Sequence, residues 1–127
     1  MKYLRNSFIA ALIACAPAAY AHEDHAHEAK HGGKIVESGH HRLEILARDG
    51  ALEVHVDGKG GHAEDMQNAK ATAAILTKGK KLDVALTPGP GNVLKGTGSF
   101  KVAKGTIIVI TRSMPGHEPE QARVTLD

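Results

Sequence analysis

The stretch HRLEILARDGALEVHVD, residues 41–57, predicts a β-hairpin. Its central dipeptide, Asp49-Gly50, is typical of two-residue hairpin turns, and segments that favour extended backbone flank it on both sides. In the second segment apolar and polar residues alternate strictly, which predicts one buried face and one wet face.

The predicted hairpin also sets which residues lie opposite each other. A two-residue turn places Glu44 opposite His55 and Arg42 opposite Asp57 across the two strands. Because cross-strand pairs of opposite charge interact favourably, we expect His55 to be a surface partner of Glu44 rather than a metal ligand.

Short apolar or alternating segments continue along the chain, separated by turn residues. Residues 106–111 (TIIVIT) have the composition of a fully buried strand, whereas residues 64–78 are compatible with a helix as well as with a strand over 71–77, which we prefer. The pattern predicts an all-β domain, a small antiparallel β-sandwich or barrel of seven or eight short strands. The remaining expected strands are 34–38, 81–87, 93–100 and 121–126.

The N-terminus has the features of an export signal. Lys2 and Arg5 precede a short apolar run, and Ala19-Tyr20-Ala21 offers a cleavage site, so residues 1–21 are expected to be a signal peptide of a periplasmic protein. The apolar run is shorter than the ~20 residues of a membrane span, and none is expected. An alternative is a lipid-anchored Cys15, since the preceding residues resemble a lipobox.

The composition of the remaining 106 residues limits the partners and metal ligands that they can have. Without Lys2 and Arg5, fourteen of the sixteen basic residues remain, and they equal the fourteen acidic residues in number. The net charge of this part is therefore near zero, and no nucleic-acid partner is expected. The single cysteine, Cys15, lies in the predicted signal peptide. Any metal would therefore be held without a thiolate, by groups such as imidazole and carboxylate.

Residues 22–33, HEDHAHEAKHGG, are expected to be a flexible histidine-rich leader before a β-domain over 34–127. Residues 27–31 match HExxH, but no apolar face holds this segment as a helix, so we reject a metalloprotease site. Imidazole suits Cu(II), Zn, Ni and Co, with Cu(II) or Zn favoured here. The predicted metal ligands of the leader are His22, His25, His27 and His31.

Other histidines are weaker candidates. His41 shares the core-facing side of its strand and, at the strand end, could form a joint metal site with His31 if the leader folds back. Met114 and His117 share a predicted tight turn, a combination that copper can use, and His62 lies in a glycine-rich loop. We expect His62 to be plain surface and the Met114 turn to be an ordinary loop.

Several stretches together resemble small exported proteins found with bacterial heavy-metal efflux systems, and the N-terminal soluble domain of some periplasmic efflux adaptors. The resemblance spans nearly all residues after 21. It implies a periplasmic β-domain that binds or delivers divalent metal and contacts an efflux component, with the leader histidines and His41 carried over. The stretches are AHEDHAHE, HGGKIVE, HRLEILARDG, ILTKGKKLDVALTP, GNVLKGTGSF, GTIIVI and QARVTL.

The sequence is therefore compatible with two functions. The first is a periplasmic divalent-metal-binding accessory protein that captures, buffers or delivers metal, with a metal-bridged dimer left open. The second is a non-catalytic interaction module that docks on an envelope or efflux complex. No catalytic constellation can be discerned in the sequence, and an enzyme is not expected.

Overall fold

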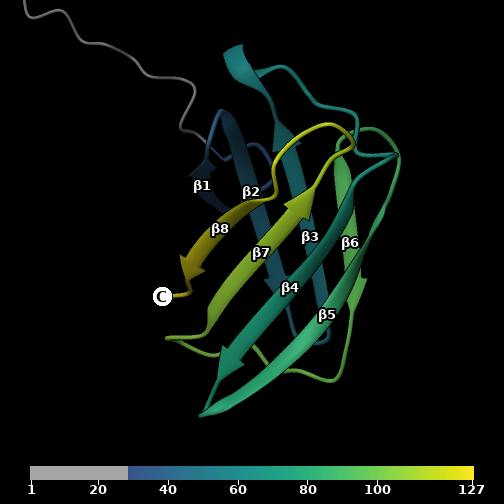
Figure 1. Cartoon of the computed structure of the whole chain (residues 1–127). Coiled ribbons are helices and arrows are strands. Elements are labelled where there is room, and N and C mark those ends of the chain that lie inside the picture. Colours follow the sequence, from purple (N-terminus) through teal and green to yellow (C-terminus); the bar gives the residue numbers. More distant parts are fainter. Residues whose placement is uncertain (1–28) are drawn as a thin grey trace, which may run out of the picture.

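The computed structural model describes residues 29–127. The predicted signal peptide and His22, His25 and His27 lie outside the described residues. Within these described residues, eight antiparallel strands form one sheet (Figure 1). They are β1 (Lys34–Ser38), β2 (His41–Arg48), β3 (Ala51–Asp57), β4 (Lys70–Thr77), β5 (Lys80–Pro88), β6 (Val93–Thr97), β7 (Ile107–Ser113) and β8 (Glu120–Thr125).

The sheet folds into two layers that almost close into a barrel. The back layer is β1-β2-β3-β6 and the front layer is β5-β4-β7-β8, and their strands cross obliquely in Figure 1. On one side the layers are joined by a short β5–β6 pairing at Thr87 and Pro88. On the other side, β1 and β8 are linked by side chains, since Ser38 Oγ donates to the Gln121 carbonyl at 2.7 Å and Lys34 Nζ to the Thr125 carbonyl at 2.9 Å.

The core lies between the two layers and confirms the predicted alternation. In β3 Leu52, Val54 and Val56 are at most 2% exposed, and β4, β5 and β7 alternate in a similar way. Met66, from the β3–β4 connection, is completely buried and belongs to the core. The all-β prediction is confirmed, and residues 70–77 form a strand rather than the alternative helix. No helix in the described part of the chain is long and apolar enough to cross a membrane.

Two strands differ from prediction by more than a shift of one or two residues at an end. β6 ends at Thr97 instead of residue 100, because the following segment turns to the β2–β3 hairpin, where Gly98 N donates to the Gly50 carbonyl at 3.1 Å. β7 is not fully buried, since Ile107 and Val109 are partly exposed on the outer face. A single-layered wall has one face in contact with the core and one facing out, so composition alone misjudged this strand.

Candidate metal-binding histidine pair

The β2–β3 hairpin has the predicted register. Glu44 lies opposite His55, and Arg42 lies opposite Asp57, with Arg42 Nη1 3.5 Å from Asp57 Oδ2. All four belong to the outer face of the back layer, because the residues that alternate with them point into the core. The hairpin therefore brings carboxylates and an imidazole together on one wall of the barrel.

The segment before β1 folds over this outer face and is held by Glu44. The backbone N–H groups of Lys30, His31 and Gly33 donate to the Glu44 carboxylate at 2.9, 2.8 and 2.9 Å. The Nδ1 atom of His31 lies 3.0 Å from Glu44 Oε1. This anchor fixes the start of the described chain against β2.

Gly33 is needed for this close approach. A Cβ atom at this position would lie 2.7 Å from the Ile45 carbonyl oxygen and 3.0 Å from Glu44 Cγ. Such contacts are too short for any side chain. The second glycine of the HGG motif is thus explained by packing of backbone against backbone.

Glu44 is ionised in this environment, although only 4% of it is exposed. Burial raises the pKa of its carboxyl, but the hydrogen bonds from Gly33, His31 and Lys30 outweigh that effect and lower the pKa to about 2. An ionised carboxylate only accepts hydrogen bonds, so His31 Nδ1 must carry the proton between them. The tautomer of a neutral His31 would leave its Nε2 atom with a lone pair.

His55 stacks on His31. The two ring centroids are 3.9 Å apart, and the ring planes differ by 11°. His55 Nε2 lies 2.8 Å from Glu53 Oε1, its neighbour two residues back on the same strand face. The expectation that His55 pairs with Glu44 is therefore wrong in its partner, because the segment before β1 satisfies Glu44 first.

The pair thus has a carboxylate on one nitrogen of each ring. Within residues 29–127, the other nitrogens, His31 Nε2 and His55 Nδ1, have no hydrogen-bond partner. Metal-binding histidines commonly donate their second ring N–H to a carboxylate, which orients the ring and raises its basicity. The His31 side chain is 45% exposed and that of His55 12%, so at least His31 is accessible from solvent.

His41 is arranged differently. Its Nε2 atom lies 2.9 Å from Glu64 Oε2 and its Nδ1 atom 2.9 Å from Glu120 Oε2, so both ring nitrogens are engaged by carboxylates. Glu120 also pairs with Arg112, a buried guanidinium. Burial lowers the pKa of Arg112, and the nearby Glu120 and Glu64 carboxylates act in the opposite direction.

The structure does not bring His31 and His41 together. His41 lies on the core-facing side of β2, as expected because Leu43, two residues later, is on the same side. His31 contacts Glu44 on the opposite side of that strand. The joint site considered from the sequence is therefore not formed. His41 links β2 to β8 and to the β3–β4 connection.

Met114 and His117 lie near His41. All three line a small pocket of about 30 Å³ at the upper end of the barrel, together with Arg112 and the acidic side chains around it. His117 N donates to the Met114 carbonyl at 3.1 Å, which confirms a tight turn there. Of the three carboxylates in this pocket, those of Glu64 and Glu120 are already engaged by His41 and Arg112. His62 is exposed in its loop.

The stacked pair alone is an incomplete site. No group of three histidine, aspartate or glutamate side chains in residues 29–127 is arranged to hold a metal ion. His27 is only four residues before His31 in the sequence, a span of at most ~14 Å, so the covalent chain allows leader histidines to reach the pair. Sequence reasoning missed His55, and the available signal was Glu53, which shares its strand face.

Comparison with known proteins found no family model, curated protein or solved structure that matches this chain. The resemblance to efflux-associated proteins therefore remains an expectation from the sequence.

Proposed function

We propose that this protein is a periplasmic divalent-metal-binding accessory protein. In this proposal His31 and His55 form the barrel half of the site, and His22, His25 and His27 supply the remaining ligands. The cargo is Cu(II) or Zn, with Ni or Co as further candidates, and it is captured, buffered or delivered to an efflux component. The role is one of binding, without catalysis.

The observation that carries the proposal is the stacked histidine pair with its two carboxylates. Glu44 and Glu53 each engage one nitrogen of one ring and leave the other nitrogen of that ring without a protein partner in the described residues. The two ring planes are nearly parallel, so one ring has to turn before both free nitrogens can bind the same ion. His41, by contrast, has a carboxylate at each ring nitrogen and leaves neither nitrogen free for a metal.

The position of the pair suits a protein that must release its metal. The pair lies next to the leader, which the sequence predicts to be flexible, so metal binding would have to order leader residues around His31 and His55. Ordering several residues costs about 1–2 kcal/mol each, which limits the affinity and allows transfer to a partner. A fully rigid cage would favour permanent retention instead.

A competitive titration tests the proposal. Cu(II), Zn, Ni and Co would be titrated against the protein that starts at His22 and against the variant His55→Phe, which can keep a stacked ring but has no nitrogen. We expect the affinity for the preferred metal to fall about tenfold or more. The matched control is His62→Phe, an exposed loop histidine, which should leave the affinity unchanged.

Two results would contradict the proposal. Equal affinity of all three proteins would remove the barrel pair from the site and leave the leader alone as the ligand. A dissociation constant larger than roughly 0.3 mM for every metal would show that metal binding is not the function.

A further inference from the structure

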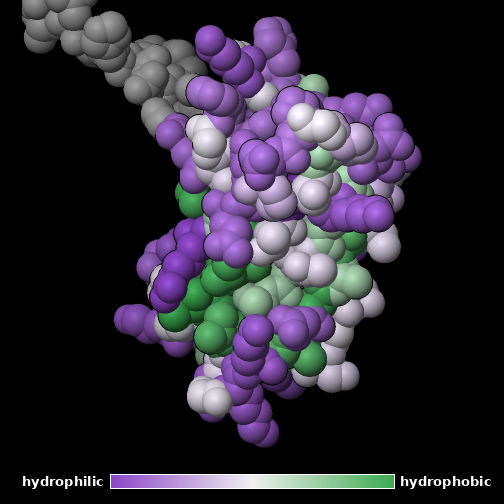
Figure 2. Space-filling model, viewed as in Figure 1, coloured by the Kyte–Doolittle hydropathy of each residue, from purple (hydrophilic) through white to green (hydrophobic). Residues whose placement is uncertain are grey.

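The outer face of the front layer has an apolar centre. Ala74 and Leu76 of β4 lie beside Val109 and Ile107 of β7, since Ala74 pairs with Val109 and Leu76 with Ile107. Leu76 is 38% exposed and is the large hydrophobic residue that stands out on the surface of residues 29–127. Hydrophobic surface gathers over β4 and β7 in Figure 2.

Of these two strands, β7 is the one whose sequence predicted burial on both faces. TIIVIT at residues 106–111 has apolar residues at successive positions, so the outward Ile107 and Val109 are as apolar as the inward Ile108 and Ile110. An outer wall exposed to water usually alternates with polar residues. The outer face of β7 is therefore more apolar than a wall that faces water normally is.

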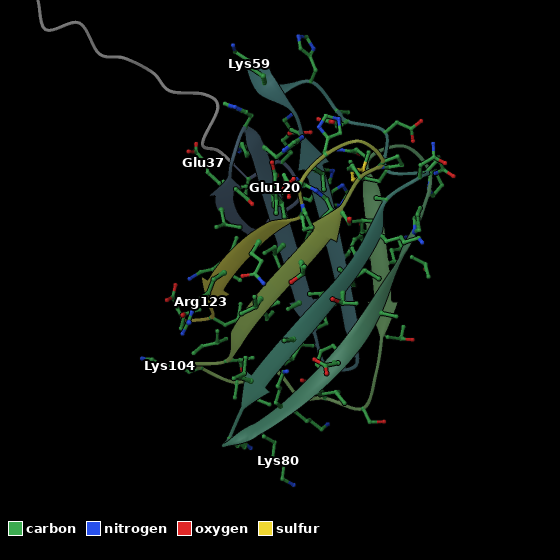
Figure 3. The ribbon with its side chains drawn as sticks, in the orientation of Figure 1. Glu37, Lys59, Lys80, Lys104, Glu120 and Arg123 are labelled. Carbon is green, nitrogen blue, oxygen red and sulfur yellow. The ribbon has the colours of Figure 1, made fainter. Side chains whose placement is uncertain are left out.

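Charges flank the apolar centre in an ordered way. The register places Asp83, Ala74, Val109 and Arg123 in one row across β5, β4, β7 and β8. The row thus has a carboxylate at one end, two apolar residues in the middle and a guanidinium at the other end. Asp83 is 72% exposed. Arg123 is exposed on the edge strand β8 and is labelled in Figure 3.

A second copy of the same face complements this row. A twofold axis parallel to the strands and midway between β4 and β7 lays β5 of one copy over β8 of the other. Asp83 then meets Arg123 of the second copy at both ends of the row, and Ala74 meets Val109 in the middle. Isologous contacts of this kind require a self-complementary patch.

We propose that the outer face of the front layer is a self-association surface that forms a twofold dimer. The central apolar residues supply the affinity, and the two Asp83–Arg123 pairs set the register, since exposed ion pairs add little energy but penalise like charges strongly. The surface is small, so we expect a weak dimer. The inference is independent of the proposed metal site, because the histidine pair lies on the opposite wall of the barrel.

Sedimentation velocity over a concentration series tests the dimer, with the protein that starts at His22 in EDTA so that no metal can bridge two copies. We expect a reversible dimer for the natural sequence. The charge reversals Asp83→Arg and Arg123→Asp should each weaken it at least tenfold. An equimolar mixture of the two variants should restore it. In the mixed dimer the introduced guanidinium of one chain meets the introduced carboxylate of the other at one end of the row, and the natural pair forms at the other end.

The control is Lys95→Glu, an equal change of charge on the back layer, which should not alter the dimer. A second variant, Leu76→Lys, should abolish the dimer while circular dichroism shows an intact fold. A natural sequence that stays monomeric up to the highest soluble concentration would overturn the proposal. So would a dimer that both charge reversals leave intact, since its interface would then lie elsewhere, or single reversals that are not rescued on mixing.

Discussion

Glu44 is the residue that joins the leader to the barrel. Its side chain is almost completely buried. Its carboxylate accepts hydrogen bonds from three backbone N–H groups and lies within hydrogen-bond distance of His31 Nδ1. A buried carboxylate is tolerated only when its oxygens are satisfied in this way. Removing its charge should therefore loosen residues 30–33 and disorder the histidine pair.

The first prediction follows from this anchor. Glu44→Gln keeps the shape of the side chain but replaces charge-assisted hydrogen bonds with neutral ones and introduces an NH₂ group that cannot accept. We expect the free energy of unfolding to fall by about 2 kcal/mol, measured by urea denaturation at neutral pH. Glu118→Gln, an exposed acid, is the control and should change little. A variant as stable as the natural protein would contradict the anchor.

The second prediction concerns pH. The pKa of Glu44 falls from 4.5 to about 2 on folding, so between these values the unfolded chain binds more protons and stability rises with pH. The Glu44 contribution, on the order of 3 kcal/mol, is complete above pH 4.5 and is lost as the pH falls toward 2. Denaturation curves should show the natural protein and Glu44→Gln converging over this interval. A constant difference would contradict the shift.

The third prediction separates His41 from the proposed metal site. His41→Ala removes contacts with Glu64 and Glu120, so we expect a loss of about 1–2 kcal/mol in the free energy of unfolding. The affinity for Cu(II) should change less than about twofold. Neighbouring His40→Ala, in an exposed turn, is the control. A large loss of affinity without a loss of stability would return His41 to the ligands, as the sequence had suggested.

Sequence predicted part of the residue-scale picture. The opposition of Glu44 to His55 followed from the two-residue turn and is confirmed. The partner of each side chain did not follow, because the segment at 30–33 lies over the hairpin only in the folded chain. Which face His41 occupies was predictable from strand alternation, but its two carboxylate partners come from distant parts of the chain.

At the scale of elements, strands were predicted well where alternation was strict and turns were marked. Residues 34–38, 41–48 and 51–57 form strands with the predicted bounds. The end of β6 was missed because residues 98–102 are bound by the Asp49-Gly50 turn, as in the 2.8 Å contact of Val102 N with Asp49 Oδ1. Such a contact between distant turns has no local signature.

The fourth prediction belongs to the corner where the two layers meet. A Cβ atom at Gly96 of β6 would lie 2.7 Å from the Ala85 carbonyl oxygen and 2.7 Å from Val84 Cγ1 in β5. Gly96→Ala should therefore lower the free energy of unfolding by about 2–3 kcal/mol in a denaturation experiment. Gly89→Ala, whose Cβ would make only ordinary contacts, should cost less, and equal losses would contradict a tight corner.

The whole molecule separates two surfaces on opposite walls. The back layer carries the stacked histidines and the start of the described chain, and the front layer carries the apolar row (Figures 1 and 2). In the proposed dimer, the two proposed metal sites would face away from each other and stay accessible. The barrel class was predictable from strand spacing, but the strand order, and hence this division of surfaces, was not, because it depends on pairing between distant strands.

The fifth prediction tests the central claim, that the barrel takes part in metal binding. Cu(II) binds imidazole more tightly than the other divalent first-row metals do, and it broadens nearby NMR signals. Substoichiometric Cu(II) would be added to ¹⁵N-labelled protein that starts at His22. We predict early loss of the amide signals of residues 30–33 and 53–57, together with those of the leader. Broadening confined to the leader, or centred on residues 114–117, would contradict a site at His31 and His55.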